Sequence, residues 1–332
     1  MRNVPPRVLI GRMVWAALLG SALVGCAKTV PPPEFDFSAQ RTTFVTHDTF
    51  DNLNPTWSPD GNTVVYVSNR ASGWNLWAVT LDGGAPRALT TGSGEDRFPA
   101  FSPDGKRIAF ASRRSGNWDV WAVNPDGTGL AQLTTHRMDD LAPAWSWDGT
   151  RIAFDSYRDF EYSIYVMDAD GANQRKLTTG GNGDWGASFA PSGDTIVFAS
   201  TRTGHGDIYA IDAMGHGPYR RLTHTEGERE MIPSFNADGS KIAFVADREG
   251  GRDIWAMNPD GSGQVRLTRN LSGAWRPQFD VDRELYAAIG YFTVAWSPDG
   301  RSLAYTHVGR NGTGQIAILR SEERRVGKEC RL

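Results

Sequence analysis

The stretch Phe98-Pro-Ala-Phe-Ser-Pro-Asp-Gly105 decides the fold, because it opens a unit that recurs along the chain. The unit continues through Arg107-Ile-Ala-Phe-Ala-Ser112 and Asp119-Val-Trp-Ala-Val123, and it ends in Gln132-Leu-Thr134. These four short runs are rich in β-branched and aromatic residues, and turn-forming residues separate them. In the Pro-Asp-Gly turn, proline presets one backbone dihedral and glycine accepts a positive one. Each unit therefore predicts four short antiparallel strands.

The aromatic residue that anchors the first run recurs at spacings of 44, 44, 44, 46 and 61 residues. The six anchors are Trp57, Phe101, Trp145, Phe189, Phe235 and Trp296. Four-stranded repeats of this length without helices are typical of β-propeller blades. One blade cannot cover both of its faces, so neighbouring blades must stack around an axis. We expect an all-β, six-bladed β-propeller over residues 41–320.

The two ends of the repeat predict how the ring closes. In complete units the final Thr precedes the next anchor by 11 residues, and Thr46 precedes Trp57 by the same number. Thr42–Thr46 is therefore a fourth strand with no blade before it, whereas Gln315–Leu319 is a third strand with no fourth. We expect the N-terminal strand to complete the last blade, which leaves no open edge. The spacing of 61 residues indicates a 17-residue insertion in the sixth blade or, less economically, a seventh blade that is mostly lost.

Residues 1–25 have the organisation of an export signal, with three Arg before a short apolar stretch. The stretch ends in Leu23-Val24-Gly25-Cys26, which resembles the lipobox of bacterial lipoproteins. This resemblance implies cleavage before Cys26 and lipidation of that residue. Ala27 follows instead of Asp, which in that family indicates the outer membrane. The alternative is an ordinary cleaved signal with an incidental Cys.

The segments that flank the repeat differ from it in composition. Residues 26–40 contain three consecutive Pro and predict a stiff, extended tether. Residues 321–332 lose the repeat pattern abruptly, and we expect this tail not to be native. Cys26 and Cys330 are the only cysteines, so an internal disulfide is not expected.

Composition excludes several classes of protein. The chain has 332 residues, 39% of them hydrophobic, with 37 Gly and 12 Trp, which argues against disorder and against a coiled coil. After the N-terminus it has no apolar run long enough to cross a bilayer. Its net charge of -3 argues against a nucleic-acid binder, which usually presents a basic surface.

An Arg follows the second run of every unit, and a polar or charged residue comes five positions after it. The Arg residues are Arg70, Arg114, Arg158, Arg202, Arg248 and Arg310, and the later residues are Asn75, Asp119, Ser163, Asp207, Asp253 and Gln315. A ring of charged ligand contacts is one interpretation. Because the pattern occurs in every unit, we favour a bond within each blade that fixes the loop between strands, for which a bidentate Arg is well suited.

The first run of each unit contains a Pro or, in one unit, Ala187. A second set of polar residues stands three positions before this residue. Its members are Asn52, Asp96, Asp140, Asp184 and Glu230. Loops between blades gather at the channel mouth of a propeller, so we expect an acidic funnel that attracts a cation or a basic partner segment and raises carboxyl pKa values. Further contact groups of the kind common in hot spots are Phe98, Trp185, Trp275 and Arg276. The alternative is that each acid caps its own turn.

The sequence contains no catalytic motif of the common hydrolase, zinc-protease or nucleotide-binding types. We therefore expect no catalytic residue, no resident metal and no cofactor, apart from a possible divalent cation in the channel. His47, His136 and His224 each follow a fourth run, so a propeller could bring them near one face. A metal site built from them is the less favoured alternative.

The motifs Trp57-Ser-Pro-Asp-Gly61, Phe101-Ser-Pro-Asp-Gly105 and Trp296-Ser-Pro-Asp-Gly300 resemble the WD40-like PD40 repeat of the TolB family. The resemblance covers about residues 41–320. It implies a six-bladed propeller that binds proteins in the periplasm and acts without catalysis. Residues 27–40 leave no room for the extra N-terminal domain of TolB itself, and TolB is not lipidated. The resemblance therefore points to a TolB-like lipoprotein.

The function expected from these features is a non-enzymatic interaction module in the bacterial cell envelope. It would be a lipid-tethered monomer, anchored in the outer membrane, that docks a protein or peptide at its channel mouth. The family resemblance implies a peptidoglycan-associated lipoprotein as the type of partner. The alternative is a propeller enzyme that acts on polysaccharide or peptide with a channel-bound metal. Acidic residues at the mouth would repel an acidic polysaccharide, which disfavours a lyase.

Overall fold

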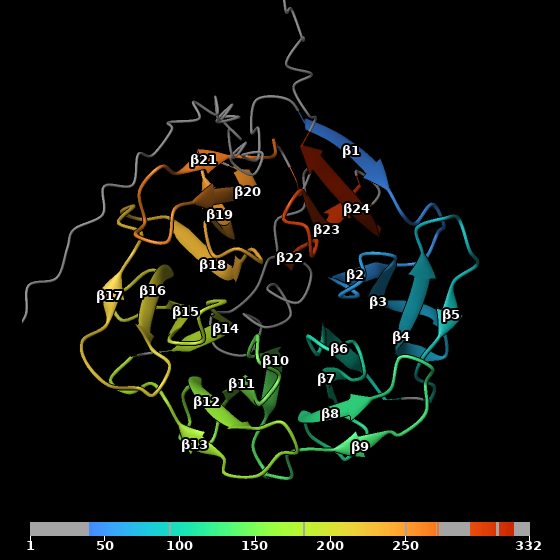
Figure 1. The fold of residues 1–332 in the computed structure, drawn as a ribbon, viewed down its shortest axis with the longest axis horizontal. Helices are drawn as coiled ribbons and strands as arrows, with labels where there is room; N and C mark the ends of the chain where they lie inside the picture. The colour runs from blue at the N-terminus through green and yellow to red at the C-terminus, as the bar shows by residue number, and fades with distance from the viewer. Residues whose placement is uncertain are drawn as a thin grey trace, which may run out of the picture. The chain divides into compact units, whose positions relative to one another are not determined.

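The described part of the chain is built entirely from β-strands. The computed structural model describes residues 40–92, 94–181, 183–249, 251–269, 271, 293–309 and 312–321. Within these ranges 24 strands form six four-stranded antiparallel sheets, and no helix occurs. Figure 1 shows the six sheets arranged around a common centre, each as one blade. The all-β, six-bladed architecture predicted from the repeat is confirmed.

Each blade begins with an inner strand that lies next to the centre and continues outward to a second strand. The inner strands are β2 (Asn52–Trp57), β6 (Asp96–Phe101), β10 (Asp140–Trp145), β14 (Asp184–Phe189), β18 (Arg229–Phe235) and β22 (Val294–Trp296). The second strands are β3 (Thr63–Ala71), β7 (Ile108–Ser112), β11 (Arg151–Ser156), β15 (Thr195–Ser200), β19 (Ile242–Arg248) and β23 (Ser302–Val308).

The two remaining strands of each blade lie farther from the centre. The third strands are β4 (Gly73–Thr80), β8 (Asp119–Val123), β12 (Ser163–Asp168), β16 (Asp207–Asp212), β20 (Gly251–Met257) and β24 (Gly314–Ser321). The outer strands are β5 (Arg87–Ala88), β9 (Ala131–Gln132), β13 (Arg175–Lys176), β17 (Arg220–Arg221), β21 (Val265–Arg266) and β1 (Gln40–Phe44).

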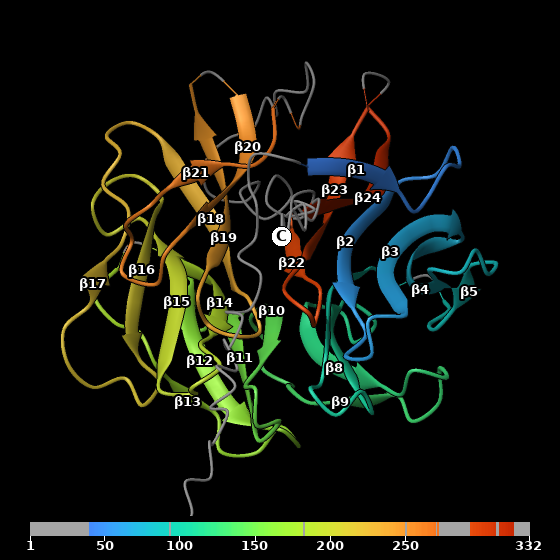
Figure 2. The same cartoon turned by 45° about the horizontal axis from the view of Figure 1, so that its top comes forward.

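The inner strands contact one another in a complete cycle. Each inner strand contacts the next one in the order β2, β6, β10, β14, β18 and β22, and β22 contacts β2. Figure 2, in which the same molecule is tilted, shows β22 and β2 on neighbouring sides of the centre. Because each inner strand touches both of its neighbours, the six sheets pack side by side around a central axis.

The last blade combines strands from both ends of the described chain. Its order is β1-β24-β23-β22, and β1 pairs with β24 in an antiparallel register that matches Thr42 to Leu319 and Phe44 to Ala317. Figure 1 shows the blue strand β1 beside the red strand β24. The backbone groups of β24 that face away from β23 therefore have partners on the N-terminal side of the chain.

The core lies between neighbouring blades, and the second strands supply much of it. Every residue of β7 is buried, and Ile152 to Ser156 of β11 are buried as well. These strands are buried along their length because the preceding blade covers one face of each sheet and the next blade covers the other. A cluster that spans the fourth, fifth and sixth blades includes Trp185, Phe244 and Leu303.

A Thr that follows the outer strand forms the same hydrogen bond in all six blades, and the bond is buried in five of them. Its hydroxyl oxygen accepts a hydrogen bond from a backbone N–H of the third strand, at 2.8–3.0 Å. The pairs are Thr90 with Leu76, Thr134 with Val120, Thr178 with Ile164, Thr223 with Ile208, Thr268 with Ile254 and Thr46 with Ile316. Thr46 therefore occupies the position that a fourth-strand Thr occupies in the other blades.

Several predicted features lie outside the described residues. They are Cys26 with residues 1–39, Trp275 and Arg276 with residues 272–292, Arg310, and residues 322–332. The first group includes the expected signal and tether, and the second contains the expected insertion before β22. Over the ranges that the structure does describe, no helix is long and apolar enough to cross a membrane.

Candidate functional site

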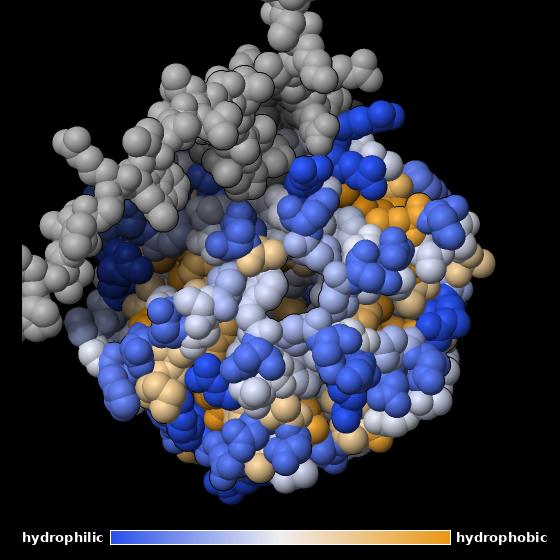
Figure 3. Space-filling model, in the orientation of Figure 1, coloured by the Kyte–Doolittle hydropathy of each residue, from blue (hydrophilic) through white to orange (hydrophobic). Residues whose placement is uncertain are grey.

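A cavity of about 470 Å³ lies along the centre of the ring, lined by all six inner strands and, in four blades, by the turn that follows. An opening is visible near the centre of the face in Figure 3. The atoms immediately around it are pale, so they are neither strongly hydrophilic nor strongly hydrophobic. The centre of the ring is therefore hollow and accessible, and its rim is not dominated by charge.

A β-bulge in the inner strand shapes the wall of this cavity in five blades. Pairing with the second strand shifts register at the bulge, and the bulged residue has a positive φ between 47° and 66°. The bulged residues are Asn54, Phe98, Ala142, Gly186 and Ile232, and all of them line the cavity. A bulge redirects side chains locally. Ile232 is β-branched, so its φ of 53° is strained backbone.

A second ring of cavity-lining positions holds only small side chains. These half-buried residues precede the aromatic anchor of each blade and are Thr56, Ala100, Ala144, Ser188, Ser234 and Ala295. Small side chains keep the cavity open, because larger ones at six converging positions would fill it. The wall thus offers apolar surface with a few hydroxyl groups, the composition typical of a site for an uncharged segment.

The acids predicted to form a funnel are buried instead. Asp96, Asp140 and Glu230 are 0% exposed, and Asp184 is 1% exposed. Each forms an ion pair within its own blade, at 2.8–2.9 Å. The pairs are Asp96 with Arg114, Asp140 with Arg158, Asp184 with Arg202 and Glu230 with Arg248. The expectation of an open acidic mouth made by these residues is therefore wrong.

The first blade uses a variant of this pair. Asn52 is also 0% exposed and accepts a hydrogen bond from Arg70 Nη2 at 3.0 Å. The same Arg70 forms an ion pair with Asp48 at 2.6 Å, and Asp48 accepts a hydrogen bond from the Asn52 amide at 2.8 Å. A carboxylate outside the strand thus supplies the negative charge that Asn52 lacks.

The recurrent Arg was predicted to bond the residue five positions later, and this pairing is also wrong. Strand pairing explains the difference: Ser112 lies opposite Asp96, so Arg114, two residues on, reaches Asp96 across the sheet. The Ser112 hydroxyl accepts a hydrogen bond from Arg114 Nε at 2.8 Å and orients the guanidinium. The later acids have other partners: Asp207 pairs with Arg221, and Asp253 with Arg266.

Aromatic rings of the same blade complete the environment of each Arg. The guanidinium carbon lies 4.8–5.4 Å from the centroid of a ring on the third strand. The pairs are Arg70 with Trp77, Arg114 with Trp121, Arg158 with Tyr165, Arg202 with Tyr209 and Arg248 with Trp255. A cation over an aromatic face is stabilised by the ring quadrupole. These Arg residues therefore fix the blade ends, as the favoured interpretation required.

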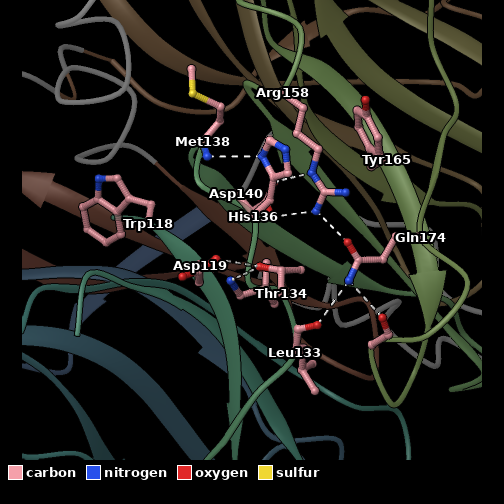
Figure 4. Close-up of polar contacts among 12 residues, drawn as sticks. Trp118, Asp119, Leu133, Thr134, His136, Met138, Asp140, Arg158, Tyr165 and Gln174 are labelled. Atoms are coloured by element: carbon pink, nitrogen blue, oxygen red, sulfur yellow. Dashed lines mark hydrogen bonds and ion pairs between the residues drawn. The ribbon is translucent and has the colours of Figure 1, made fainter. Parts of the chain in front are cut away.

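Figure 4 shows this arrangement in the third blade, where Arg158 lies between Asp140 and Gln174. The Gln174 amide in turn donates to the carbonyl oxygen of Leu133 in the preceding blade, at 3.3 Å. The network thus ties two blades together. In the fifth blade burial raises the pKa of Glu230, an effect that the charge of Arg248 opposes.

The remaining predicted contact residues are placed differently from one another. Phe98 lines the cavity. Trp185 is 4% exposed and packs into the core between blades with Met231 and Ala199, so it does not line the cavity. Its neighbour Gly186 holds the cavity-lining position instead.

One cavity neighbour was missed by the sequence reasoning. Asp155 on β11 is 1% exposed, and its carboxylate accepts a hydrogen bond from the Gly186 N–H in the next blade, at 3.0 Å. The equivalent positions elsewhere hold Ala111, Ala199 or another uncharged residue. At the position two residues before the aromatic anchor, the fourth blade has Ala187 and the sixth has Val294, where the other four blades have Pro. An alignment of the six units would have shown the unusual Asp155 in the second strand and the unusual Ala187 in the inner strand.

The histidines do not form a common site. His136 Nδ1 accepts a hydrogen bond from the Met138 N–H at 3.2 Å, as Figure 4 shows. His47 contacts Phe44, at 6.2 Å between ring centroids. Among the residues in the described ranges, no group of three or more His, Cys, Asp or Glu is arranged to hold a metal ion. The alternative that joined His47, His136 and His224 is thus not supported by the geometry.

Comparison with known protein structures agrees with the architecture. A TolB-type protein from Agrobacterium tumefaciens is 21% identical, and the match covers 86% of this chain and 98% of that one, with a TM-score of 0.62. TolB from Acinetobacter baumannii is 22% identical, over 87% of this chain and 65% of that one, with a TM-score of 0.62. The chain therefore spans just under two thirds of the second protein.

Enzymes with the same fold are also similar. An oligogalacturonate lyase in complex with manganese is 15% identical over 85% of this chain and 93% of its own, with a TM-score of 0.59. At these identities the likeness shows the fold alone. No curated protein matches the chain. A family model described as the TolB beta propeller domain matches residues 35–139, 135–230 and 185–289, which together cover most of the repeat. The chain belongs to the TolB β-propeller family.

Proposed function

We propose that this protein is a non-enzymatic binding module of the bacterial cell envelope, which holds a protein or peptide segment at its central cavity. Membership of the TolB family supports an envelope role in protein binding. The observation that carries the proposal is the cavity of about 470 Å³, walled by bulged inner strands and small side chains. Its volume falls in the usual range of ligand sites.

The chemistry of the wall favours an uncharged, extended segment as the ligand. Asp96, Asp140, Asp184 and Glu230 are buried and paired with Arg within their own blades, so they offer little attraction to a basic peptide. Phe98 and the prolines of the inner strands supply apolar contact, and Ser188 and Ser234 supply hydroxyl groups. Trp275 and Arg276 remain proposed contacts that lie outside the described residues.

The proposed location is the periplasmic side of the outer membrane, with a lipid on Cys26. The Pro-rich tether of residues 26–40 would span about 45 Å if extended. That reach would let the propeller meet a partner bound to peptidoglycan while it stays anchored. A peptidoglycan-associated lipoprotein is the proposed type of partner, and the protein is proposed to act as a monomer.

A variant that fills the cavity tests the proposed function. Ala144→Phe would place a large ring on the inner wall, and Leu130→Phe would add the same ring at a position that is 44% exposed and outside the cavity. We expect the first variant to lose binding to the purified periplasmic domain of a peptidoglycan-associated lipoprotein, measured by calorimetry, and the second to bind like wild type. Equal affinity for both would refute binding at the cavity.

The rival function is a metal-dependent enzyme, and the fold of the manganese-bound oligogalacturonate lyase favours testing it. The wild-type protein would be incubated with oligogalacturonate and Mn²⁺, and unsaturated products would be followed by ultraviolet absorbance. We expect no turnover above that of the buffer. Turnover that requires Mn²⁺ and disappears in Ala144→Phe would replace the binding function by the enzymatic one.

A further inference from the structure

One loop departs from the six-fold repeat in a way that costs the backbone energy. Between the second and third strands, the loops of three other blades place Gly at a left-handed position: Gly116, Gly204 and Gly312, with φ of 117°, 92° and 82°. The third blade has Phe160 there, with a φ of 61°. A side chain in this region is strained, whereas glycine is not. Strain of this kind at an exposed position is a reason to look for a function.

Phe160 is also far more exposed than an aromatic residue needs to be. Its exposed fraction is 72%, compared with 54% for Met214 and 44% for Leu130. These are the three most exposed large hydrophobic residues within the described ranges. The side chain therefore gains little from burial within this chain, and its presence is not explained by the stability of the fold.

The loop that carries Phe160 is held firmly. The Phe160 N–H donates to the Tyr157 carbonyl at 3.2 Å, and the Tyr157 N–H donates to the Asp139 carbonyl at 2.9 Å. On one side of the tip, Asp159 forms an ion pair with Lys176 at 2.8 Å. Within the same loop, the rings of Tyr157 and Tyr162 lie with their centroids 4.9 Å apart. A rigid support lowers the entropy lost when a partner binds the tip.

The loop lies at the end of the blade where the inner strand begins. Ser156, the last residue of β11, is paired with Asp140, the first residue of β10. The loop after Ser156 is thus at the same end of the ring as the segments that join successive blades. A partner bound at this end of the ring could therefore contact both Phe160 and the segments that join successive blades.

We propose that Phe160 is an anchor for a protein partner that presents an apolar pocket bordered by a cationic group. The tip reads Asp159-Phe160-Glu161, and Glu161 forms no ion pair with another described residue. An aromatic side chain beside an unpaired carboxylate fits such a pocket, and burial of one aromatic anchor commonly dominates an interface. The carboxylate disfavours an anionic membrane surface or an acidic glycan. This inference rests on the proposed binding function.

Photo-cross-linking in intact cells tests which class of molecule meets Phe160. Benzoylphenylalanine is placed at position 160 and, as a control, at position 130, and the adducts are identified by mass spectrometry. We expect a protein adduct at 160 and none at 130. An adduct with lipid or glycan, or no adduct at 160, would overturn the proposal.

The substitution Phe160→Gly then separates the anchor from the fold. Glycine is the residue that equivalent loops carry, and it relieves the positive φ, so we expect an unchanged or higher Tm. The affinity for the purified cross-linked protein should fall about 30-fold or more. Leu130→Ala is the matched control and should bind like wild type. Unchanged affinity of Phe160→Gly would refute the anchor.

The same assay distinguishes failure of the anchor from failure of the proposed function. If Ala144→Phe abolishes binding and Phe160→Gly does not, the cavity is the binding site and only the proposal for Phe160 is refuted. If neither variant changes the affinity for the cross-linked protein, both proposals fail.

Discussion

In the second to fifth blades, a buried acid forms an ion pair with an Arg of the same blade. The carboxylate is removed from water, so it needs both the charge of the Arg and hydrogen bonds from neighbours. Asp96 accepts hydrogen bonds from Arg114 at 2.9 and 3.0 Å and from the Thr90 hydroxyl at 2.5 Å. Thr90 belongs to the preceding blade, so this carboxylate joins two blades as well as two strands.

Removal of one partner from this pair should be costly. Arg114→Met keeps much of the apolar stem but leaves Asp96 buried without its counter-charge. We expect a loss of about 3–5 kcal/mol in the free energy of unfolding, measured by urea denaturation. Lys106→Met is the control, because Lys106 pairs with Asp104 on the surface, where side chains are 80% and 55% exposed. It should change stability by less than about 1 kcal/mol.

A companion variant identifies the origin of that loss. Asp96→Asn combined with Arg114→Met removes the uncompensated charge, while the amide oxygen can still accept from Thr90. We expect the double variant to be more stable than Arg114→Met alone. If it were equally unstable, lost packing rather than a buried charge would be responsible.

Among the elements, a turn with a Ser-to-Asp hydrogen bond follows the inner strand in four of the six blades. In the third blade the Ser146 hydroxyl donates to Asp148 at 2.6 Å, and the same carboxylate oxygen accepts from the Thr150 N–H at 3.0 Å. Gly149 follows with a φ of 70°. These hydrogen bonds favour the ionised carboxylate and lower the pKa of Asp148 to about 2. The pKa values of the equivalent Asp60, Asp104 and Asp238 are lowered as well.

The lowered pKa values predict a specific sensitivity to acid. A carboxyl group with a depressed pKa in the folded state stabilises the protein above its unfolded pKa of 3.8, and this stabilisation is lost as the pH falls toward about 2. We expect Asp148→Asn to be less stable than wild type at pH 7, with a difference that shrinks between pH 4 and pH 2. Urea midpoints across this range provide the measurement. A difference that stays constant with pH would contradict the assignment.

The inner strands are also joined across blades by tryptophan. The indole N–H of Trp57, Trp145 and Trp296 donates to a carbonyl oxygen of the preceding inner strand, at 3.1–3.2 Å. The acceptors are Ala295, Ala100 and Ser234. The other three anchors are Phe, which cannot make this bond. The aromatic anchor thus has a packing role in every blade and a bonding role in half of them.

A matched pair of Trp→Phe substitutions tests the bonding role. Trp145→Phe removes the hydrogen bond to Ala100 and should cost about 1 kcal/mol. Trp121→Phe removes a buried N–H that has no hydrogen-bond partner among the described residues, so it should be neutral or slightly stabilising. Thermal unfolding of both variants gives the comparison. An equal loss at the two positions would show that ring volume, and not the bond, matters.

At the scale of the whole molecule, strands from the two ends of the described chain pair at a seam in the last blade. β1 pairs with β24 over five residue pairs, and the Thr46 hydroxyl accepts a buried hydrogen bond from the Ile316 N–H at 2.9 Å. The first and last blades also meet through the Trp57 indole and the Ala295 carbonyl. If the seam opened, both the edge of β24 and the first inner strand would lose partners.

Equivalent Thr→Val substitutions measure how firmly the seam is closed. Thr46→Val and Thr134→Val keep the side-chain shape but remove the acceptor of a buried N–H, so each should cost about 1–3 kcal/mol. If β1 is bound as firmly as an outer strand within a continuous blade, the two losses in urea denaturation will be similar. If Thr46→Val left the free energy of unfolding unchanged, β1 would be detached from the last blade in solution.

Sequence reasoning succeeded where the signal is local. The turn motif and the four-run unit predicted the strands, because strands and turns depend on residues close together in the chain. The number of repeated anchors from Trp57 to Trp296 then predicted six blades. The candidate site was harder. Phe98 lines the cavity, whereas Trp185, one position earlier in its own strand, packs into the core between blades. A one-residue offset in a strand reverses the face, and the bulge adds a further shift.

The sequence by itself thus determined the repeat, its strands and turns, and the number of blades, because backbone propensities and turn chemistry act over a few residues. The tertiary structure alone decided which charges are buried and which partners neutralise them. Arg114 meets Asp96, eighteen residues earlier, and not Asp119, because antiparallel register and the covering blade set both distance and exposure. These are contacts between distant parts of the chain, and the linear spacing of residues does not encode them.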